Sequence, residues 1–189
     1  PVTYRSSGLA QETGVSGIVY HIMGINGATC ASFSTPENLH AVAGLDPDLI
    51  IVSFGTNEAH GRNYSAEEHR RQLTSFFTEL KNRCPHAAFL LTTPPGAYMR
   101  SGRRGKTINT RTPRVVETEK RFAADNGLAL WDLYDIAGGQ ERACRNWTAA
   151  NMFQRDRIHF TQEGYVLQGL LLHEAFIKAY NDYVATKLD

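Results

Sequence analysis

Two short apolar runs constrain the fold of this chain more than any other feature. The segments "DLIIVSF" (residues 48–54) and "AAFLLTT" (residues 87–93) are almost continuously hydrophobic. Strands of a parallel sheet show this pattern because helices cover both of their faces. The polar stretch between them, residues 65–84, is long enough for the helix that a parallel connection needs. The sequence therefore predicts an α/β fold with a parallel sheet.

The other elements are predicted from the same alternation of patterns. Ser65 and Glu68 have the spacing of a capping box at the start of the helix over residues 65–84. Apolar residues recur on one face of that helix: Leu73, Phe76, Phe77 and Leu80. Strands are predicted at 17–23 and 128–134, helices at 109–126, 140–150 and 162–186, and a polar, basic loop at 96–106.

Length and composition exclude several classes of protein. The 189 residues suit a single domain, residues 1–189. A net charge of +1 gives no electrostatic footprint for nucleic acid, so no nucleic-acid partner is predicted. No window of 18 consecutive apolar residues occurs, which predicts no membrane span.

The cysteines and histidines show no recognisable metal-binding pattern. None of the three cysteines belongs to a C-x-x-C pair, which excludes a zinc ribbon. One disulfide between Cys84 and Cys144 is conceivable, and three buried free thiols, including Cys30, are the simpler interpretation. His60 and His69 are expected at solvated positions around a helix start. No metal and no cofactor are predicted.

Two glycine-containing turns follow predicted strands, at the edge of the sheet where ligands of α/β proteins bind. In "GTNE", the Asn57 amide either caps its own turn or donates to a developing oxyanion. In "GINGAT", Gly27 either serves backbone conformation alone or presents its N–H to the same oxyanion. The pattern G-x-G-x-x-G is absent, so no dinucleotide site is predicted.

The segment "DRIHFT" (residues 156–161) carries the strongest chemical signal. His159 lies just before the last predicted helix and can act as a general base if a partner fixes its tautomer. Asp156, three residues earlier, can accept from its Nδ1–H. A surface Asp–His pair without function is the alternative interpretation.

Taken in order, the three motifs resemble those of the SGNH hydrolase superfamily, also called GDSL esterases. The similarity covers residues 17 to about 180 and implies a three-layer α/β/α, flavodoxin-like fold. The glycine of the family's second block matches Gly27, and its D-x-x-H block matches Asp156 and His159. Its G-x-N-D block matches Gly55 and Asn57. The family's final aspartate is replaced there by Glu58.

The resemblance implies a serine that the sequence does not provide. The family's first block, G-D-S, carries the nucleophile at the end of a central strand, between the strands matched at 17–23 and 48–54. Ser6 and Ser7 follow no apolar strand, and no G-x-S-x-G elbow is present. We therefore expect a C-terminal portion of a longer protein, whose missing N-terminal segment supplies the central strand and the serine.

The function implied by the resemblance is cofactor-free hydrolysis of O-acetyl or short acyl esters on a carbohydrate. The C-terminal motifs look most like those of bacterial, secreted or periplasmic members, including peptidoglycan O-acetylesterase-like proteins. The basic loop carries Arg100, Arg103 and Arg104, which either bind an anionic group of the substrate or are simply solvated. This chain alone is expected to be inactive. The alternative is a non-catalytic, carbohydrate-binding relic of the fold.

Overall fold

A three-stranded parallel sheet forms the centre of the molecule. The computed structural model describes residues 5–8, 17–101 and 105–188. Strands β3 (Leu49–Ser53), β4 (Ala88–Thr92) and β7 (Ala129–Trp131) lie in the order β3-β4-β7, with Ile51 opposite Leu90 and Leu90 opposite Ala129. The predicted parallel α/β architecture is confirmed.

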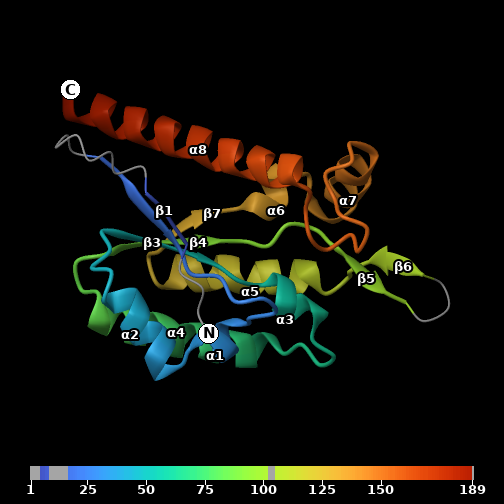
Figure 1. Cartoon of the computed structure of the whole chain (residues 1–189), viewed down its shortest axis with the longest axis horizontal. Helices are drawn as coiled ribbons and strands as arrows, with labels where there is room; N and C mark the ends of the chain where they lie inside the picture. Colours follow the sequence, from blue (N-terminus) through green and yellow to red (C-terminus); the bar gives the residue numbers. More distant parts are fainter. Residues whose placement is uncertain (1–4, 9–16, 102–104, 189) are drawn as a thin grey trace.

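Helices cover both faces of this sheet, giving three layers (Figure 1). Helix α8 crosses one face, whereas α4 and α5 cover the other. The helices are α1 (Cys30–Phe33), α2 (Pro36–Ala43), α3 (Thr56–His60), α4 (Ala66–Arg83), α5 (Thr112–Asp125), α6 (Leu133–Ile136), α7 (Gly139–Ala149) and α8 (Gln162–Leu188). The short α3 was not predicted from the sequence; it begins directly after the "FG" that ends the β3 segment.

The main core lies between the sheet and α4. The four apolar residues predicted on one face of this helix are all buried, together with Leu91 of β4. Each such side chain contributes roughly 1.5–3 kcal/mol of burial free energy. At the helix start, Ser65 accepts from the Glu68 N–H, but the Glu68 carboxylate binds Arg71 and Gln72. The predicted capping box is therefore only half formed.

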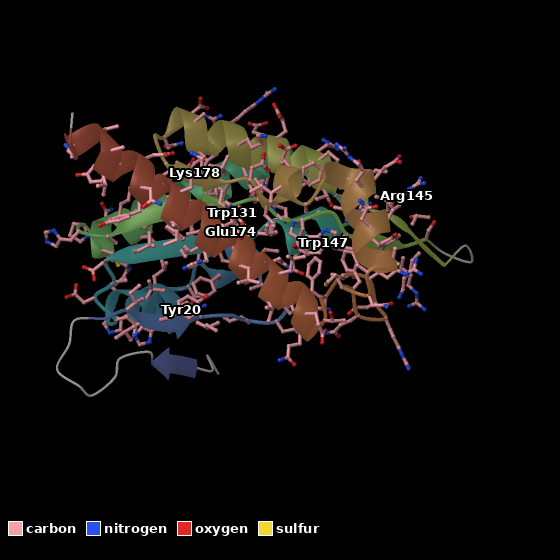
Figure 2. The ribbon with its side chains drawn as sticks, turned by 90° about the horizontal axis from the view of Figure 1, so that it is seen from above. Tyr20, Trp131, Arg145, Trp147, Glu174 and Lys178 are labelled. Atoms are coloured by element: carbon pink, nitrogen blue, oxygen red, sulfur yellow. The ribbon has the colours of Figure 1, made fainter. Side chains whose placement is uncertain are left out.

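Helix α8 packs on the opposite face of the sheet. Leu171, Leu172 and Ala175 contact the buried Leu90 and Trp131, and Figure 2 shows Trp131 beneath this helix. Other sides of α8 leave large apolar side chains exposed: Tyr165, Val166, Leu170, Phe176, Ile177, Tyr180 and Tyr183. In the described ranges, no helix is long and apolar enough to cross a membrane.

Two antiparallel strand pairs lie outside the parallel sheet. Strand β1 (Arg5–Gly8) pairs with β2 (Val19–Ile22), and β5 (Tyr98–Arg100) pairs with β6 (Lys106–Ile108). No element before residue 17 was assigned from the sequence, so β1 was missed, and the loop predicted over 96–106 was wrong because β5 and β6 pair there. These polar segments lack an apolar run, and pairing with a neighbouring strand is what satisfies their backbone groups.

All three cysteines are buried, and none forms a disulfide. Burial raises the pKa of Cys30 to about 12 and that of Cys144 to about 11. The neutral thiols therefore behave as small apolar side chains, as the simpler interpretation of the sequence predicted.

Candidate active site

Asp156 and His159 form a hydrogen-bonded pair in the segment that leads into α8. His159 Nδ1 lies 2.6 Å from Asp156 Oδ2. The other carboxylate oxygen, Oδ1, accepts from the N–H groups of Ile158 and His159, each at 2.9 Å. The carboxylate is thereby fixed, and it directs the second ring nitrogen, Nε2, away from itself. Both side chains remain about half exposed, so a substrate can reach them.

Aromatic packing holds the segment of residues 151–161, here called the Asp-His loop. Phe153 and Phe160 form a β-bridge and stack with ring centroids 4.6 Å apart. Phe160 is buried and also contacts Trp147 of α7, at 5.2 Å between centroids. Because Phe160 directly follows His159, this anchor fixes the backbone next to His159.

The pKa of Asp156 reflects these contacts. Partial burial by itself would raise it, but the hydrogen bond from the His159 ring and the two backbone N–H donors outweigh burial. Together they lower the pKa of Asp156 to about 2. The carboxylate is therefore ionised at any ordinary pH and can stabilise an imidazolium that forms on His159.

The two glycine-containing turns lie against each other. The Asn57 amide donates to the Ala28 carbonyl at 2.7 Å, which places the start of α3 beside the "GINGAT" turn. An amide NH2 has two hydrogens, so Asn57 retains one donor besides this contact. Gly27 is exposed with φ +74°, and an added Cβ there would meet no atom within 4 Å. The positive φ favours glycine at this position, and the space beside its Cα is open.

Glu58 forms a second connection between these turns. Its Oε1 accepts from the Cys30 N–H at 2.7 Å and its Oε2 accepts from the Gly55 N–H at 2.8 Å. Glu58 is buried, and two backbone donors are the partners that a buried carboxylate needs. The residue that departs from the family's aspartate thus joins the two turns.

A buried polar cluster behind this connection was not recognised from the sequence. Glu119 of α5 is fully buried, and His69 of α4 lies 3.8 Å away between Nε2 and Oε1. Burial, and then the negative charge of Glu58, raises the pKa of Glu119 well above its usual value. Burial lowers the pKa of His69. Burial thus favours the neutral form of both groups, and the expectation of a solvated His69 was wrong.

His60 is also not a solvated surface residue. It is half-buried, and its ring contacts the backbone carbonyls of Thr56 and Tyr98. Periodicity in the sequence could not predict these contacts. Tyr98 is distant in sequence from His60, and Glu119 is distant from His69.

The structure places one of the three predicted arginines. Arg100 is exposed at the end of β5 and is paired with Lys106 of β6. Arg103 and Arg104 lie outside the described residues. Two positively charged residues thus lie on neighbouring strands, and Lys106 Nζ donates to the Arg155 carbonyl. In the described part of the chain, no group of three or more His, Cys, Asp or Glu side chains is arranged to hold a metal.

The structure thus combines a three-layer α/β/α fold with a paired Asp156 and His159 before the last helix and with joined glycine turns after β2 and β3. The chain matches the GDSL-like Lipase/Acylhydrolase family over residues 2–167. It therefore belongs to that family. Comparison with curated proteins gives no match.

Solved structures share this fold. A peptidoglycan O-acetylesterase superposes with a TM-score of 0.75 at 24% identity, covering 85% of this chain and 46% of that one. A lipase/acylhydrolase from Enterococcus faecalis gives 0.59 at 28% identity, covering 77% and 69%. An acetyl xylan esterase gives 0.63 at 18% identity, covering 80% and 78%. The chain thus spans less than half the length of the O-acetylesterase chain.

Proposed function

We propose that this chain is the acid–base and oxyanion-binding part of a serine ester hydrolase. Asp156 orients His159, and Nε2 of His159 takes the proton from a serine as the serine attacks the ester carbonyl. The remaining Asn57 donor and the Gly27 N–H stabilise the oxyanion. Collapse of the tetrahedral intermediate releases the alcohol, and water then hydrolyses the acyl-enzyme. The 2.6 Å contact between His159 Nδ1 and Asp156 Oδ2 carries this proposal.

The serine in this proposal comes from a segment beyond residues 1–189, which adds a central strand beside β3. Within the described residues, β3 pairs with β4 alone, and β2 belongs to a separate sheet. Ser6 and Ser7 lie opposite His21 and Tyr20 in that separate sheet, not in the parallel one. Strand β3 leads into the "GTNE" motif and yet lies at an edge of the sheet. The backbone N–H and C=O groups on its outer side are unpaired in this sheet, and another strand can pair with them.

Exposed apolar side chains support the same proposal. Val19, Tyr20 and Ile22 of β2 are each about half exposed, and Figure 2 shows β2, with Tyr20, on the β3 side of the sheet. Val166 and Leu170 of α8 are likewise exposed. Contiguous exposed apolar patches mark surfaces that another segment or partner can cover. A further strand would cover part of it.

The proposed substrate is an O-acetylated or short-acyl carbohydrate, cleaved outside the cytoplasm. Two structural relatives, a peptidoglycan O-acetylesterase and an acetyl xylan esterase, carry such names. The facing Arg100 and Lys106 would suit an acidic group on the glycan. Secreted or periplasmic localisation follows from the same resemblance and belongs to the proposal.

Hydrolysis of a chromogenic acetyl ester tests the function. The longer protein should turn the ester over and His159→Ala should abolish turnover, whereas residues 1–189 alone should be inactive. His86→Ala, at an exposed histidine before β4, is the control. Turnover by residues 1–189 that His159→Ala abolishes would contradict the external serine. An inactive longer protein that binds carbohydrate would instead indicate a non-catalytic relic.

A further inference from the structure

His60, at the end of α3, lies between two backbone carbonyls. Its Nδ1 is 2.7 Å from the Thr56 oxygen and its Nε2 is 3.0 Å from the Tyr98 oxygen. A carbonyl oxygen only accepts hydrogen bonds, so a ring nitrogen bonds to it only when that nitrogen carries a proton. The imidazolium form satisfies both contacts, whereas either neutral tautomer satisfies one. The ring therefore connects α3 to β5 across 38 positions of sequence.

Tyr98 extends this connection to the Asp-His loop. Its N–H donates to the Arg157 carbonyl at 3.0 Å, and the Arg157 guanidinium lies over the Tyr98 ring, 5.0 Å from its centroid. Arg157 lies between Asp156 and His159 in the chain and has φ +58°, in the left-handed region. The backbone of Tyr98 thus contacts His60 through its carbonyl and the Asp-His loop through its N–H.

The tyrosine itself is well anchored. Its side chain is buried, and its hydroxyl donates to the Cys144 carbonyl of α7 at 3.2 Å. On the other side of His60, the Thr56 carbonyl belongs to the residue directly before Asn57. The imidazole therefore lies between the helix that carries the oxyanion donor and the strand that supports the general base.

We propose that His60 is a positioning residue that holds α3, with Asn57, in register with the Asp-His loop. The inference rests on the proposed function, which gives Asn57 and His159 their roles. Acyl transfer needs the oxyanion donor and the base in place at the same moment, and a shift of about 1 Å can lower the rate about 100-fold. His60 touches no reacting atom and acts through Thr56 and Tyr98.

The test uses the longer, serine-containing protein with His60→Ala, His60→Gln and the control His86→Ala. We expect His60→Ala to lower kcat about 10- to 100-fold with little change in KM. Added imidazole should restore part of the kcat of His60→Ala, because it can occupy the same place. His60→Gln has one amide group in place of the two ring nitrogens. Its kcat should therefore lie between that of the wild type and that of His60→Ala.

NMR gives a readout that does not depend on turnover. In His60→Ala, the Tyr98 amide hydrogen should exchange faster with solvent. The NMR signal of the His159 Nδ1 proton, which is hydrogen-bonded to Asp156, should become weaker. His86→Ala should leave both signals unchanged.

The outcomes separate the inference from the function. An active wild type with unchanged kcat in His60→Ala overturns the inference alone. An inactive wild type overturns the proposed function, and then an unchanged Tyr98 amide and His159 proton in His60→Ala overturn the inference too. If His60→Ala does not fold, His60→Gln decides, and wild-type kcat and NMR signals in that variant would refute the positioning role.

Discussion

The Asp156 carboxylate is ionised far below neutral pH, and this decides what its replacement should do. With a pKa of about 2, Asp156 can both orient His159 and stabilise the imidazolium. The substitution Asp156→Asn would keep the size of the side chain but remove the charge and allow the wrong His159 tautomer. We expect kcat of the longer protein to fall on the order of 10³- to 10⁴-fold, measured with an acetyl ester.

The protonation state of Asp156 sets the pH range over which Asp156→Asn should be impaired. Because Asp156 titrates near 2, its charge does not change between about pH 4 and 8, and Asp156→Asn should be impaired throughout that range. Asp182→Asn, at an exposed aspartate paired with Lys178 on α8, is the control and should be fully active. A loss of activity confined to acid pH in Asp156→Asn would argue against the assigned role.

Glu119 offers a prediction about stability. Its raised pKa means that the folded state holds a proton that the unfolded chain releases near pH 4.5. This contribution to stability is complete below about pH 4.5 and is lost as pH rises toward the folded-state pKa. The Gln side chain of Glu119→Gln has no titratable proton. Across that window, the free energy of unfolding of this variant should therefore rise relative to that of the wild type by up to about 1.4 kcal/mol per pH unit.

Urea unfolding at a series of pH values measures this effect. The matched control is Glu117→Gln on the same helix, whose exposed carboxylate pairs with Arg121 and should change stability by less than about 0.5 kcal/mol. A difference between Glu119→Gln and the wild type that stays constant with pH would show that Glu119 is not held neutral by the fold.

At the residue scale, local spacing was predictable and long-range contact was not. Asp156 and His159 are three positions apart, so their pairing could be proposed directly from "DRIHFT". The Asn57 contact with Ala28 spans 29 positions and the His60 contact with Tyr98 spans 38. Such contacts depend on how strands and helices pack, which residue types alone do not specify.

At the element scale, the junction between β3 and α3 depends on Gly55. The residue has φ +101°, and an added Cβ would lie 2.7 Å from Glu119 Oε1 and 2.7 Å from Pro94 Cγ. Gly55→Ala should therefore lower the free energy of unfolding by about 2–4 kcal/mol, through backbone strain and overpacking. Gly127→Ala is the control, because φ is +60° but nothing lies within 4 Å; it should lose about 1–2 kcal/mol. Equal losses in thermal or urea unfolding would show that crowding at Gly55 is unimportant.

Elements with a strong periodic pattern were predicted within a few residues. Helix α4 was expected from its amphipathic face, and β3 and β4 from their apolar runs, because burial on a known face dictates each pattern. The hairpin of β5 and β6 was missed because Arg100 and Lys106 are polar residues whose strand conformation depends on each other. Strand β1 was missed for the same reason.

At the scale of the whole molecule, both α8 and β2 leave apolar side chains exposed. Helix α8 covers the sheet with Leu171 and Leu172 but leaves Val166 and Leu170 exposed. Strand β2 presents exposed apolar side chains on the β3 side of the sheet. The parallel sheet of the family could be predicted from the sequence, whereas the separate pairing of β1 with β2 could not, since it needs the arrangement in space.

The proposed function predicts that a longer protein, which includes the serine-bearing segment, is more stable than residues 1–189 alone. A central strand beside β3 would pair its free N–H and C=O groups and cover apolar surface of β2 and α8, each 100 Å² of which contributes about 2.5 kcal/mol. The longer protein should unfold at a higher temperature, bind less of a hydrophobic dye such as ANS, and protect the amides of Ile51 and Ser53 from hydrogen exchange. Equal exchange of these two amides in both proteins would show that the added segment does not pair with β3. Amides of α4 such as Leu73, already buried in the main core, serve as the internal reference, because the added strand lies outside their surroundings.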